Sequence, residues 1–493
     1  MGTTIEAVRG MRDVLPPEYE HQTTVTKTLH RVLTSYGYRW IDLPLVERRD
    51  LYLRKLGEEL VGKVYEFTFN GRDLALRPEW TASVLRAYVS RMQDQPLPLR
   101  LCYAGPVFRN ERPQRATYRQ FTQIGVELIG GPAPRADAEC IALACRGLDE
   151  VGVEAYQVRI GHVGFIRHLL TELHLAERTQ GFLVWSLERM RSQGSESIRS
   201  QLDMEEESLP FDASLLEGIE DAQAEALLQH ALESIGVNLR FGTRPPEAIV
   251  ERLVRKLHRK DPEANIERAM DLLAQLSGLQ GPPATVFPMA ERLLQSFDLP
   301  VSGLDELQTI IDLVHAHGVP KDHVTVDFGL GRGLHYYTGL IFEVYAADGL
   351  QLCGGGRYDD LVAAFGGRQP VPAVGFAYGL ERVVAAISTP HTVVPSHEVL
   401  VVVGDDESYV SALRVADELR SCGVIVTLDV RSRSLASNVR DATRRDIRFI
   451  AIVDQTWNET RNVLWRNMTT QEEISVSVAD FVENTLRYTT QTQ

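Results

Sequence analysis

Arginine side chains are concentrated in the segment 108–121, together with an aromatic ring. The run Phe-Arg-Asn-Glu-Arg-Pro-Gln stands at 108–114, and Tyr-Arg-Gln-Phe stands at 118–121. Planar guanidinium groups can bind phosphate or carboxylate oxygens with two hydrogen bonds, and Phe121 offers a flat face for a base. The segment is therefore typical of nucleotide binding. A solvated basic hairpin is the alternative, because charge runs usually face water.

Two glycine-containing segments are candidates for the floor of a ligand pocket. Gly-Arg-Gly-Leu-His-Tyr-Tyr-Thr-Gly at 331–339 and Ile-Phe-Glu-Val-Tyr at 341–345 precede Cys-Gly-Gly-Gly-Arg-Tyr-Asp at 353–359. The pattern predicts two strands joined by a turn. The glycines at 354–356 would let a backbone or a ligand approach where a Cβ atom would collide. Glycines in strands also mark simple bulges, which is the alternative.

A third segment, Ala-Val-Gly-Phe-Ala-Tyr-Gly-Leu-Glu-Arg at 373–382, predicts a buried strand that opens into a helix. Gly379 and Arg382 are one helical turn apart and share a face. A nucleotide can lie against the glycine while the arginine contacts its phosphates. Together the three segments favour a nucleotide site over the alternatives.

At these residues the chain resembles the class II aminoacyl-tRNA synthetases, whose motifs 2 and 3 are similar to segments 108–121 and 373–382. Arg-Gly-Leu-His-Tyr-Tyr and Gly-Gly-Arg-Tyr-Asp resemble the two signatures of the histidyl branch. Four further segments agree with the family: Val-Arg-Gly-Met-Arg-Asp-Val-Leu-Pro at 8–16, Tyr-Gly-Tyr-Arg-Trp-Ile-Asp-Leu-Pro at 36–44, Leu-Arg-Pro-Glu-Trp-Thr-Ala at 76–82, and Gln-Ile-Gly-Val-Glu at 123–127.

The resemblance implies that the chain forms an aminoacyl-adenylate from ATP, and that it does so with magnesium. It assigns Arg109 and Arg332 to the α-phosphate and Arg382 to the far end of the triphosphate. Fixed cations of this kind stabilise the charge that develops at phosphorus, so these three are the expected catalytic residues. The resemblance also assigns Gln114 to tRNA. The expected ATP-binding residues are Arg109, Glu111, Phe121, Gly379 and Arg382.

The resemblance also implies a pocket for histidine. Glu79, Thr81 and Gln123 carry hydrogen-bond acceptors that suit an ammonium group. Glu127, Tyr336 and Tyr337 can bracket an imidazole by accepting and donating hydrogen bonds. A buried glutamate is costly unless it is paired, so two glutamates in one pocket favour a cationic ligand. The expected amino-acid-binding residues are Glu79, Trp80, Thr81, Gln123, Glu127, Arg332, Tyr336 and Tyr337.

The chain departs from the family pattern at three positions. Trp80 replaces a small residue, Thr117 replaces an arginine, and His335 stands where the family has aspartate. In addition, segments 125–130 and 161–170 resemble the regulatory subunit of ATP phosphoribosyltransferase, a non-catalytic relative that senses histidine with the same fold. Two functions therefore stay open: a histidine–tRNA ligase and a histidine-sensing regulatory subunit in histidine biosynthesis.

Composition is compatible with a soluble enzyme of 493 residues. The net charge of −15 argues against a generally basic nucleic-acid-binding protein, although local tRNA contacts need only a patch. The five cysteines form no Cys-x-x-Cys pair, so we expect neither a zinc site nor a disulfide framework. No apolar run is long enough for a membrane span, and the N-terminus lacks a signal pattern. We therefore expect a cytoplasmic protein.

The fold class that the resemblance implies is α+β, with the antiparallel class II sheet flanked by helices, a helical insertion and a C-terminal α/β domain. The expected halves of the catalytic core are 1–168 and 319–390. The helical insertion is expected at 169–318, because the hydrophobic pattern between them is strongly helical. An anticodon-binding-like domain is expected at 396–493.

The hydrophobic pattern also predicts individual elements. The expected helices are 17–37, 136–152, 214–235, 246–258, 265–278, 408–421 and 435–446. Further strands are expected at 39–46, 64–69, 399–403, 424–428 and 449–453. Strands alternate with helices after a linker-like segment at 389–396, which indicates a small parallel or mixed α/β domain.

The segment 36–44 resembles motif 1, whose strand and preceding helix form the two-fold interface of class II synthetases. A homodimer is therefore expected, since such an isologous contact pairs one patch with itself. Apolar side chains for this patch are available at Trp40, Ile41, Leu43 and Leu45. The expected partners are thus histidine, ATP, tRNA(His) and a second copy of the chain, with no membrane.

Overall fold

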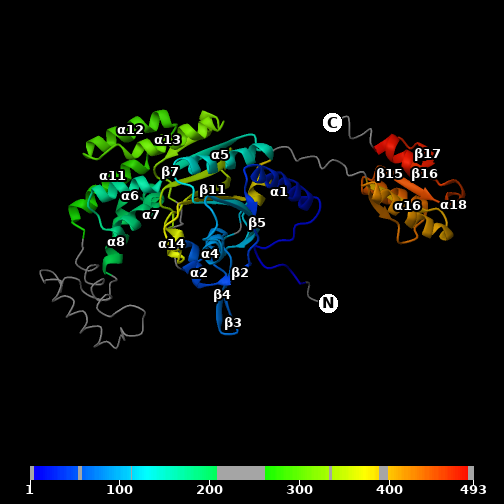
Figure 1. The fold of residues 1–493 in the computed structure, drawn as a ribbon, viewed down its shortest axis with the longest axis horizontal. Coiled ribbons are helices and arrows are strands. Elements are labelled where there is room, and N and C mark those ends of the chain that lie inside the picture. The colour runs from blue at the N-terminus through cyan, green and yellow to red at the C-terminus, as the bar shows by residue number, and fades with distance from the viewer. Residues whose placement is uncertain are drawn as a thin grey trace. The chain divides into compact units, whose positions relative to one another are not determined.

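The chain divides into two compact units, Met1–Thr389 and Pro390–Gln493, in the computed structural model (Figure 1). The expected helices 214–235 and 246–258 and the linker at 389–396 lie outside the residues that the structure describes. The described residues are 5–53, 58–112, 114–207, 261–331, 336–387 and 398–486.

A nine-stranded sheet forms the centre of the first unit and confirms the expected α+β fold class. In spatial order its strands are β1 (Arg39–Trp40), β5 (Leu99–Phe108), β6 (Gln120–Ile129), β12 (Ala373–Gly379), β11 (Gln351–Arg357), β10 (Leu340–Ala346), β7 (Tyr156–His162), β9 (Val324–Asp327) and β8 (Gln280–Gly281). Neighbouring strands run antiparallel except in the β1–β5 and β7–β9 pairs. Because β10 to β12 lie between β6 and β7, the later part of the chain completes a sheet that the earlier part began.

Helices α1 (Glu18–Ser35) and α5 (Arg135–Glu150) pack against each other, and α5 also packs against β11 and β12 (Figure 1). Val25, Leu29 and Val32 recur at helical spacing on α1 and are buried, so this helix presents one apolar stripe to the core. The predicted helix 17–37 is confirmed, and the chain leaves it at Gly37, whose φ of +82° a residue with a Cβ atom rarely adopts.

A group of helices precedes the second half of the sheet, in the part of the chain where the helical insertion is expected. They are α6 (Val163–Glu172), α7 (Glu177–Gln193), α8 (Ser195–Glu207), α11 (Glu263–Ser277), α12 (Pro283–Ser296) and α13 (Gly303–Ala316). This segment is not separate from the core, since β8 joins the central sheet and α13 packs on α5. No helix among the described residues is both long enough and apolar enough to cross a membrane.

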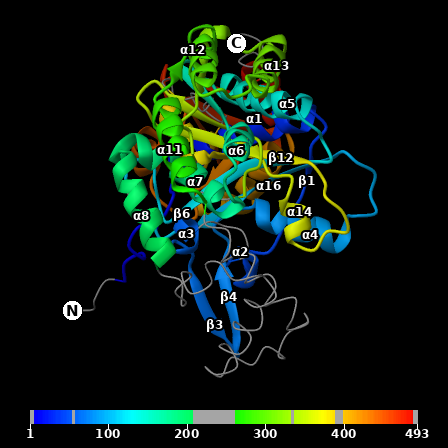
Figure 2. The same cartoon turned by 90° about the vertical axis from the view of Figure 1, so that its left-hand side faces the viewer.

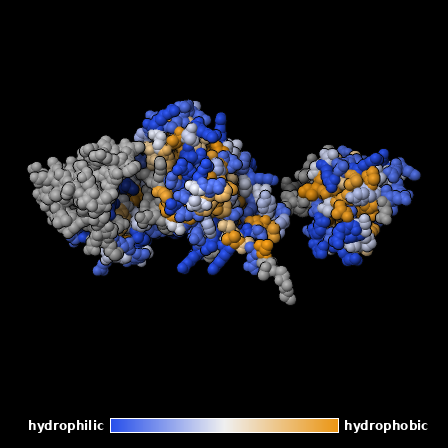
Figure 3. Space-filling view, turned by 90° about the horizontal axis from the view of Figure 1, so that it is seen from below, coloured by the Kyte–Doolittle hydropathy of each residue, from blue (hydrophilic) through white to orange (hydrophobic). Residues whose placement is uncertain are grey.

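A small sheet of β2 (Val46–Arg48), β4 (Arg72–Leu76) and β3 (Glu66–Phe69) follows the short strand β1. In both views its β3–β4 hairpin projects on the side opposite α12 and α13 (Figures 1 and 2). The predicted strand 39–46 is wrong in its middle, where Pro44 has no N–H to donate to a ladder. Phe69 on this hairpin is exposed. The face of the molecule in Figure 3 mixes hydrophilic and hydrophobic residues.

The second unit contains a five-stranded sheet, and its predicted helices and strands are confirmed. In spatial order the strands are β14 (Ile425–Leu428), β13 (Glu398–Val403), β15 (Phe449–Val453), β16 (Asn462–Asn467) and β17 (Glu473–Ser477). The first three are parallel, and they are connected by α16 (Tyr409–Ser421) and α17 (Leu435–Arg444). The antiparallel strands β16 and β17 had not been predicted individually.

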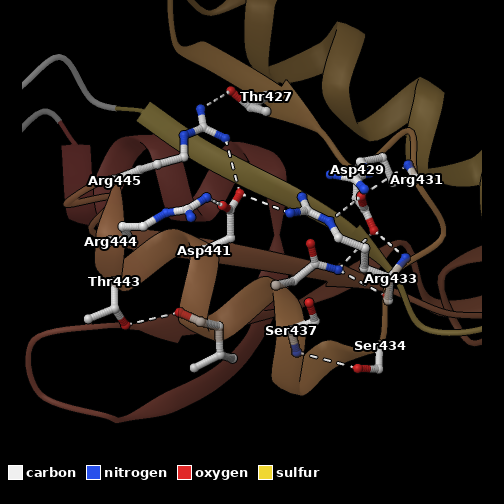
Figure 4. A network of polar contacts seen from close by, with 12 residues as sticks. Thr427, Asp429, Arg431, Arg433, Ser434, Ser437, Asp441, Thr443, Arg444 and Arg445 are labelled. Carbon is white, nitrogen blue, oxygen red and sulfur yellow. Dashed lines mark hydrogen bonds and ion pairs between the residues drawn. The ribbon is translucent and has the colours of Figure 1, made fainter.

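A buried carboxylate organises the loop between β14 and α17 (Figure 4). Asp429 accepts hydrogen bonds from the backbone N–H groups of Arg431 (3.1 Å) and Arg433 (2.8 Å), the Arg433 guanidinium (3.0 Å) and the Asn438 amide (2.9 Å). Burial opposes ionisation, but the hydrogen bonds from Asn438 and the arginines outweigh it and lower the pKa of Asp429. This network therefore stabilises the loop as a charged, fully partnered structure.

Candidate active site

A cavity of about 700 Å³, partly open to solvent, lies where β5, β6, β11 and β12 meet the start of α4 (Thr81–Arg91). It brings together side chains that are far apart in the sequence. The sequence-predicted residues that line it are Glu79, Thr81, Arg109, Phe121, Gln123, Tyr336, Tyr337, Gly379 and Arg382.

Close packing of strands explains the glycines of the cavity floor. A Cβ atom on Gly355 would lie 2.1 Å from the carbonyl oxygen of Gly375, and one on Gly375 would lie 1.9 Å from a carboxylate oxygen of Glu127. The register of β11 against β12 runs without interruption from Cys353 to Arg357, so a bulge does not account for the three consecutive glycines. Neighbouring strands and side chains, rather than a turn, require glycine here.

Two guanidinium groups border the cavity. Arg109, at the end of β5, donates from Nε to the carbonyl of Pro78 (2.8 Å), and its guanidinium carbon lies 5.3 Å from the centre of the Phe121 ring. Arg382, on α15 (Leu380–Ala386), donates to the Thr117 hydroxyl (3.3 Å) and to Gln351 (3.4 Å). The two arginines give one part of the lining a positive charge suited to phosphate.

Buried acceptors form another part of the lining. Glu79 is 3% exposed, and its Oε1 accepts a hydrogen bond from the backbone N–H of Ala82 (2.9 Å). Its Oε2 and the Oε1 of Gln123 are buried and have no hydrogen-bond partner among the described residues. Burial raises the pKa of Glu79. Unpartnered buried acceptors are costly, so this part of the lining suits a ligand that donates hydrogen bonds.

Glu127 lies behind the lining rather than on it. Its Oε1 accepts hydrogen bonds from the hydroxyls of Thr81 (2.7 Å) and Tyr103 (3.0 Å), and its Oε2 accepts one from Tyr358. Burial raises the pKa of Glu127 to about 8, although the hydroxyl donors oppose that shift. The three hydroxyl residues line the cavity themselves, so Glu127 contacts the site through them.

Sequence reasoning missed both tyrosines that hold Glu127. Tyr358 stands inside the Gly-Gly-Arg-Tyr-Asp signature, which was the signal that could have identified it. The guanidinium of the preceding Arg357 is buried and donates to Asp137 (3.0 Å) and Asp359 (2.9 Å), which fixes the chain at this point. Tyr103 had no such signal, because a single tyrosine in an apolar strand is usually a core residue.

The remaining sequence-predicted residues do not line the cavity or cannot be placed. Trp80 is 1% exposed and packs away from the cavity, so it does not narrow the pocket. Glu111 and Gln114 belong to the loop after β5 and are not lining residues. Arg332 and His335 lie outside the described residues.

Known proteins resemble this chain over nearly its whole length. The family model described as histidyl-tRNA synthetase matches residues 10–235 and 227–383, and that described as anticodon binding domain matches residues 397–487. A histidine–tRNA ligase of Methanococcus maripaludis is 31% identical over 477 residues, which are 96% of this chain and 98% of the relative. One of Archaeoglobus fulgidus is 34% identical over 479 residues, with coverage of 96% and 97%.

A solved structure supports the fold. The crystal structure of histidyl-tRNA synthetase from Nostoc sp. PCC 7120 has a TM-score of 0.66 and 23% sequence identity, and it covers 99% of this chain and 100% of its own. That likeness concerns the fold, while the family models and the curated relatives cover nearly the whole sequence. The chain therefore belongs to the histidyl-tRNA synthetase family.

Proposed function

We propose that this protein is a histidine–tRNA ligase, which activates histidine with ATP and transfers the histidyl group to tRNA(His). The observation that carries the proposal is a single cavity lined by two guanidinium groups and by two buried acceptors that have no hydrogen-bond partner among the described residues. Such a cavity suits a polyphosphate together with an ammonium compound. The curated relatives bear the name histidine–tRNA ligase, which supports the same activity.

In the proposed activation step, a carboxylate oxygen of histidine attacks the α-phosphorus of ATP. A new bond forms between that oxygen and phosphorus, and the bond to the bridging oxygen breaks, so pyrophosphate leaves with the electron pair. Arg109 stabilises the negative charge on the α-phosphate, and Arg382 binds the far end of the triphosphate. We assign Arg332 to the α-phosphate as well, from the family resemblance alone. Phe121 and Gly379 provide the surface for adenine.

The amino acid is placed by the buried acceptors. The ammonium group of histidine donates to Glu79 and Gln123, whose unpartnered oxygens it would satisfy. The imidazole lies against the rings of Tyr336 and Tyr337, whose centres are 4.7 Å apart. Glu127 acts on the imidazole indirectly, through the hydroxyl groups of Thr81, Tyr103 and Tyr358, from which it accepts hydrogen bonds. An apolar amino acid would leave these polar groups unpaired, which is the basis of the proposed selectivity.

Magnesium is the expected companion of ATP. Among the described residues, no group of three or more His, Cys, Asp or Glu side chains could hold a metal ion. Glu79 is the single carboxylate among the described side chains that line the cavity. Magnesium often takes one or two protein carboxylates together with substrate phosphates. The described residues do not form a magnesium site by themselves, and no step of the proposal runs through the ion.

We assign tRNA binding to the second unit, with Gln114 in the first. The guanidinium groups of Arg431, Arg440, Arg444 and Arg448 are exposed on α17 or beside it, and Figure 4 shows Arg431 and Arg444. A protein with net charge −15 needs such a local cluster to bind phosphates. Replacing Arg440 and Arg444 by alanine should reduce the salt dependence of tRNA binding by about two phosphate contacts. An unchanged salt dependence would remove this assignment.

We also propose that the protein forms a homodimer and is located in the cytoplasm. The dimer rests on the resemblance of 36–44 to motif 1, and β1 in this segment is an edge strand. Leu45 and Val46 beside it are 42% and 41% exposed, which leaves apolar surface for a partner. Light scattering at micromolar concentration should give twice the mass of one chain, and a stable monomer would contradict the dimer.

Exchange of pyrophosphate into ATP tests the enzymatic proposal. The wild-type protein should catalyse exchange with histidine and not with the other nineteen amino acids. Arg382→Ala should reduce the exchange rate strongly, whereas Arg368→Ala should not, because Arg368 is exposed and pairs with Asp94 on the surface. Histidine binding without any exchange in the wild type would instead support the regulatory-subunit function.

A further inference from the structure

The indole of Trp80 contacts both a guanidinium group and a tyrosine ring. Its ring is stacked on Tyr103 with centres 4.7 Å apart and planes 10° apart. The guanidinium carbon of Arg77 lies 3.4 Å from the centre of the indole. Trp80 therefore makes both an aromatic contact and a cation–π contact. All three side chains are no more than 1% exposed.

Other contacts also hold this stack in place. The indole N–H donates to the carbonyl of Gly105 (3.4 Å), and Arg77 donates to the carbonyls of Pro106 (2.9 Å) and Leu43 (2.9 Å). A Cβ atom on Gly105 would lie 3.0 Å from the indole and 2.8 Å from the Arg77 guanidinium. The glycine at 105 therefore leaves the space that the large indole needs. The surroundings of Trp80 thus fit an indole side chain.

The stack ends at the histidine pocket. Tyr103 lines the cavity, and its hydroxyl donates to Glu127 (3.0 Å). A tyrosine side chain in a strand can adopt more than one χ1 rotamer, and a change of χ1 moves its hydroxyl, unless packing against the ring holds it in place. Trp80 covers one face of the Tyr103 ring and so limits where its hydroxyl can point.

We propose that Trp80 is a positioning residue for histidine selection, because its indole holds the Tyr103 hydroxyl against Glu127. The inference rests on the proposed function, since it concerns the same pocket. A small residue at position 80 would leave the Tyr103 ring face unpacked in this chain. The departure from the family pattern is thus part of how this pocket is built, and Trp80 acts through Tyr103 without touching the ligand.

Three variants of Trp80 test the inference by calorimetric titration with histidine. Trp80→Leu and Trp80→Met remove the flat ring while keeping an apolar side chain, and each should raise the histidine Kd about tenfold, the loss expected for one displaced hydrogen bond. Trp80→Phe keeps a flat ring and should stay within about threefold of the wild type. The KM for ATP should stay within twofold in all three. Phe165→Leu, a buried substitution whose side chain does not line the cavity, is the control for general loss of packing.

A double-mutant cycle separates positioning from ordinary packing. Tyr103→Phe removes the hydroxyl and should itself weaken histidine binding. If Trp80 acts through that hydroxyl, Trp80→Leu should add almost nothing in the Tyr103→Phe background. Additive effects, or equal rises in Kd for Trp80→Phe and Trp80→Leu, would overturn the inference.

Two controls keep the experiment decisive. Thermal unfolding identifies any variant that does not fold, and Trp80→Met replaces Trp80→Leu in the cycle if the leucine variant is lost. Wild-type exchange and histidine binding are measured first. Their absence would count against the proposed function, whereas an active wild type with an unchanged Kd in Trp80→Leu would count against the role of Trp80 alone.

Discussion

Glu127 in the first unit and Asp429 in the second are both buried carboxylates, with 1% and 4% of their surface exposed. Their hydrogen-bond donors differ in kind. Glu127 accepts from three neutral hydroxyls, and burial raises its pKa to about 8. Burial also opposes the ionisation of Asp429, but hydrogen bonds from an amide, two backbone N–H groups and a guanidinium lower its pKa. The two sites thus bury the same chemical group with opposite consequences for its charge.

The difference shows what each region is built for. Around Asp429 every donor belongs to the loop before α17 or to that helix, so the carboxylate stabilises local structure. Around Glu127 the donors also line a cavity, and in the described part of the chain nearby Glu79 and Gln123 each keep one oxygen without a hydrogen-bond partner. Charge that is completely matched by the protein supports the fold. Polar groups left unmatched in a cavity indicate a ligand.

The largest expected effect concerns the cavity. Arg109→Ala should lower histidine-dependent exchange by about a hundredfold or more, because its charge acts mainly in the transition state. The free energy of unfolding should change little, since the arginine serves the ligand. Arg115→Ala is the matched control in the same loop, where Arg115 is exposed and pairs with Asp348. Equal losses in the two variants would break the distinction between cavity and surface charges.

The second prediction concerns the matched carboxylate. Asp429→Ala should destabilise the second unit by about 2–3 kcal/mol, because buried donors lose their acceptor. Exchange activity should persist, since the cavity lies within the first unit. The destabilisation caused by Asp429→Ala should be smaller in acid. Because the pKa of Asp429 is lowered in the folded state, its carboxylate stabilises the fold at pH values above the ordinary pKa of 3.8. That stabilisation disappears as the pH falls through the folded-state pKa. Urea unfolding measures this, with exposed Asp417→Ala as the control.

The third prediction uses the opposite shift at Glu127. Between pH 4.5 and about 8 the folded protein keeps a proton on Glu127 that the unfolded chain releases. Stability should therefore fall as pH rises through this window. The fall from pH 5 to pH 8 should be smaller in Glu127→Gln by at least about 1.4 kcal/mol, the value of one pKa unit. Parallel pH profiles of unfolding for the two proteins would show that Glu127 ionises normally.

The smallest expected effect is at the edge of the Asp429 network. Arg444 pairs with Asp441 (2.7 Å), but its side chain is 81% exposed. Exposed ion pairs contribute little, so Arg444→Ala should change the free energy of unfolding by less than about 0.5 kcal/mol. Denaturant unfolding of this variant beside Asp429→Ala would show whether burial, and not the mere presence of an ion pair, sets the cost.

Much of the fold could be predicted from local pattern. The helix 17–37 has regular apolar spacing and a glycine at its end, and the alternation of strands and helices after residue 398 is equally regular. Prediction was wrong where one residue or a distant contact decides. Pro44 interrupts the strand expected at 39–46, and β8 is a two-residue strand inside a helical segment. Such a strand exists because β9 pairs with it, not because of its own sequence.

Part of the candidate site could likewise be predicted from the sequence, and part could not. The arginines, the acidic groups and the glycine-rich strands were recognisable as residue types at characteristic spacing, because such groups are typical of sites for phosphate and ammonium ligands. The direction of each side chain was not recognisable. Tyr103 pairs with Gly125 across β5 and β6, and this register determines which strand residues face the cavity.

The sequence by itself therefore determined the residue types of the candidate site and the helices and strands that have a regular apolar pattern, because residue type and local propensity suffice for these. Only the tertiary structure decided that Glu127 lies behind three hydroxyls and that Trp80 packs away from the cavity against Tyr103. The physical reason is that the facing of a strand side chain depends on register between segments up to about 250 residues apart.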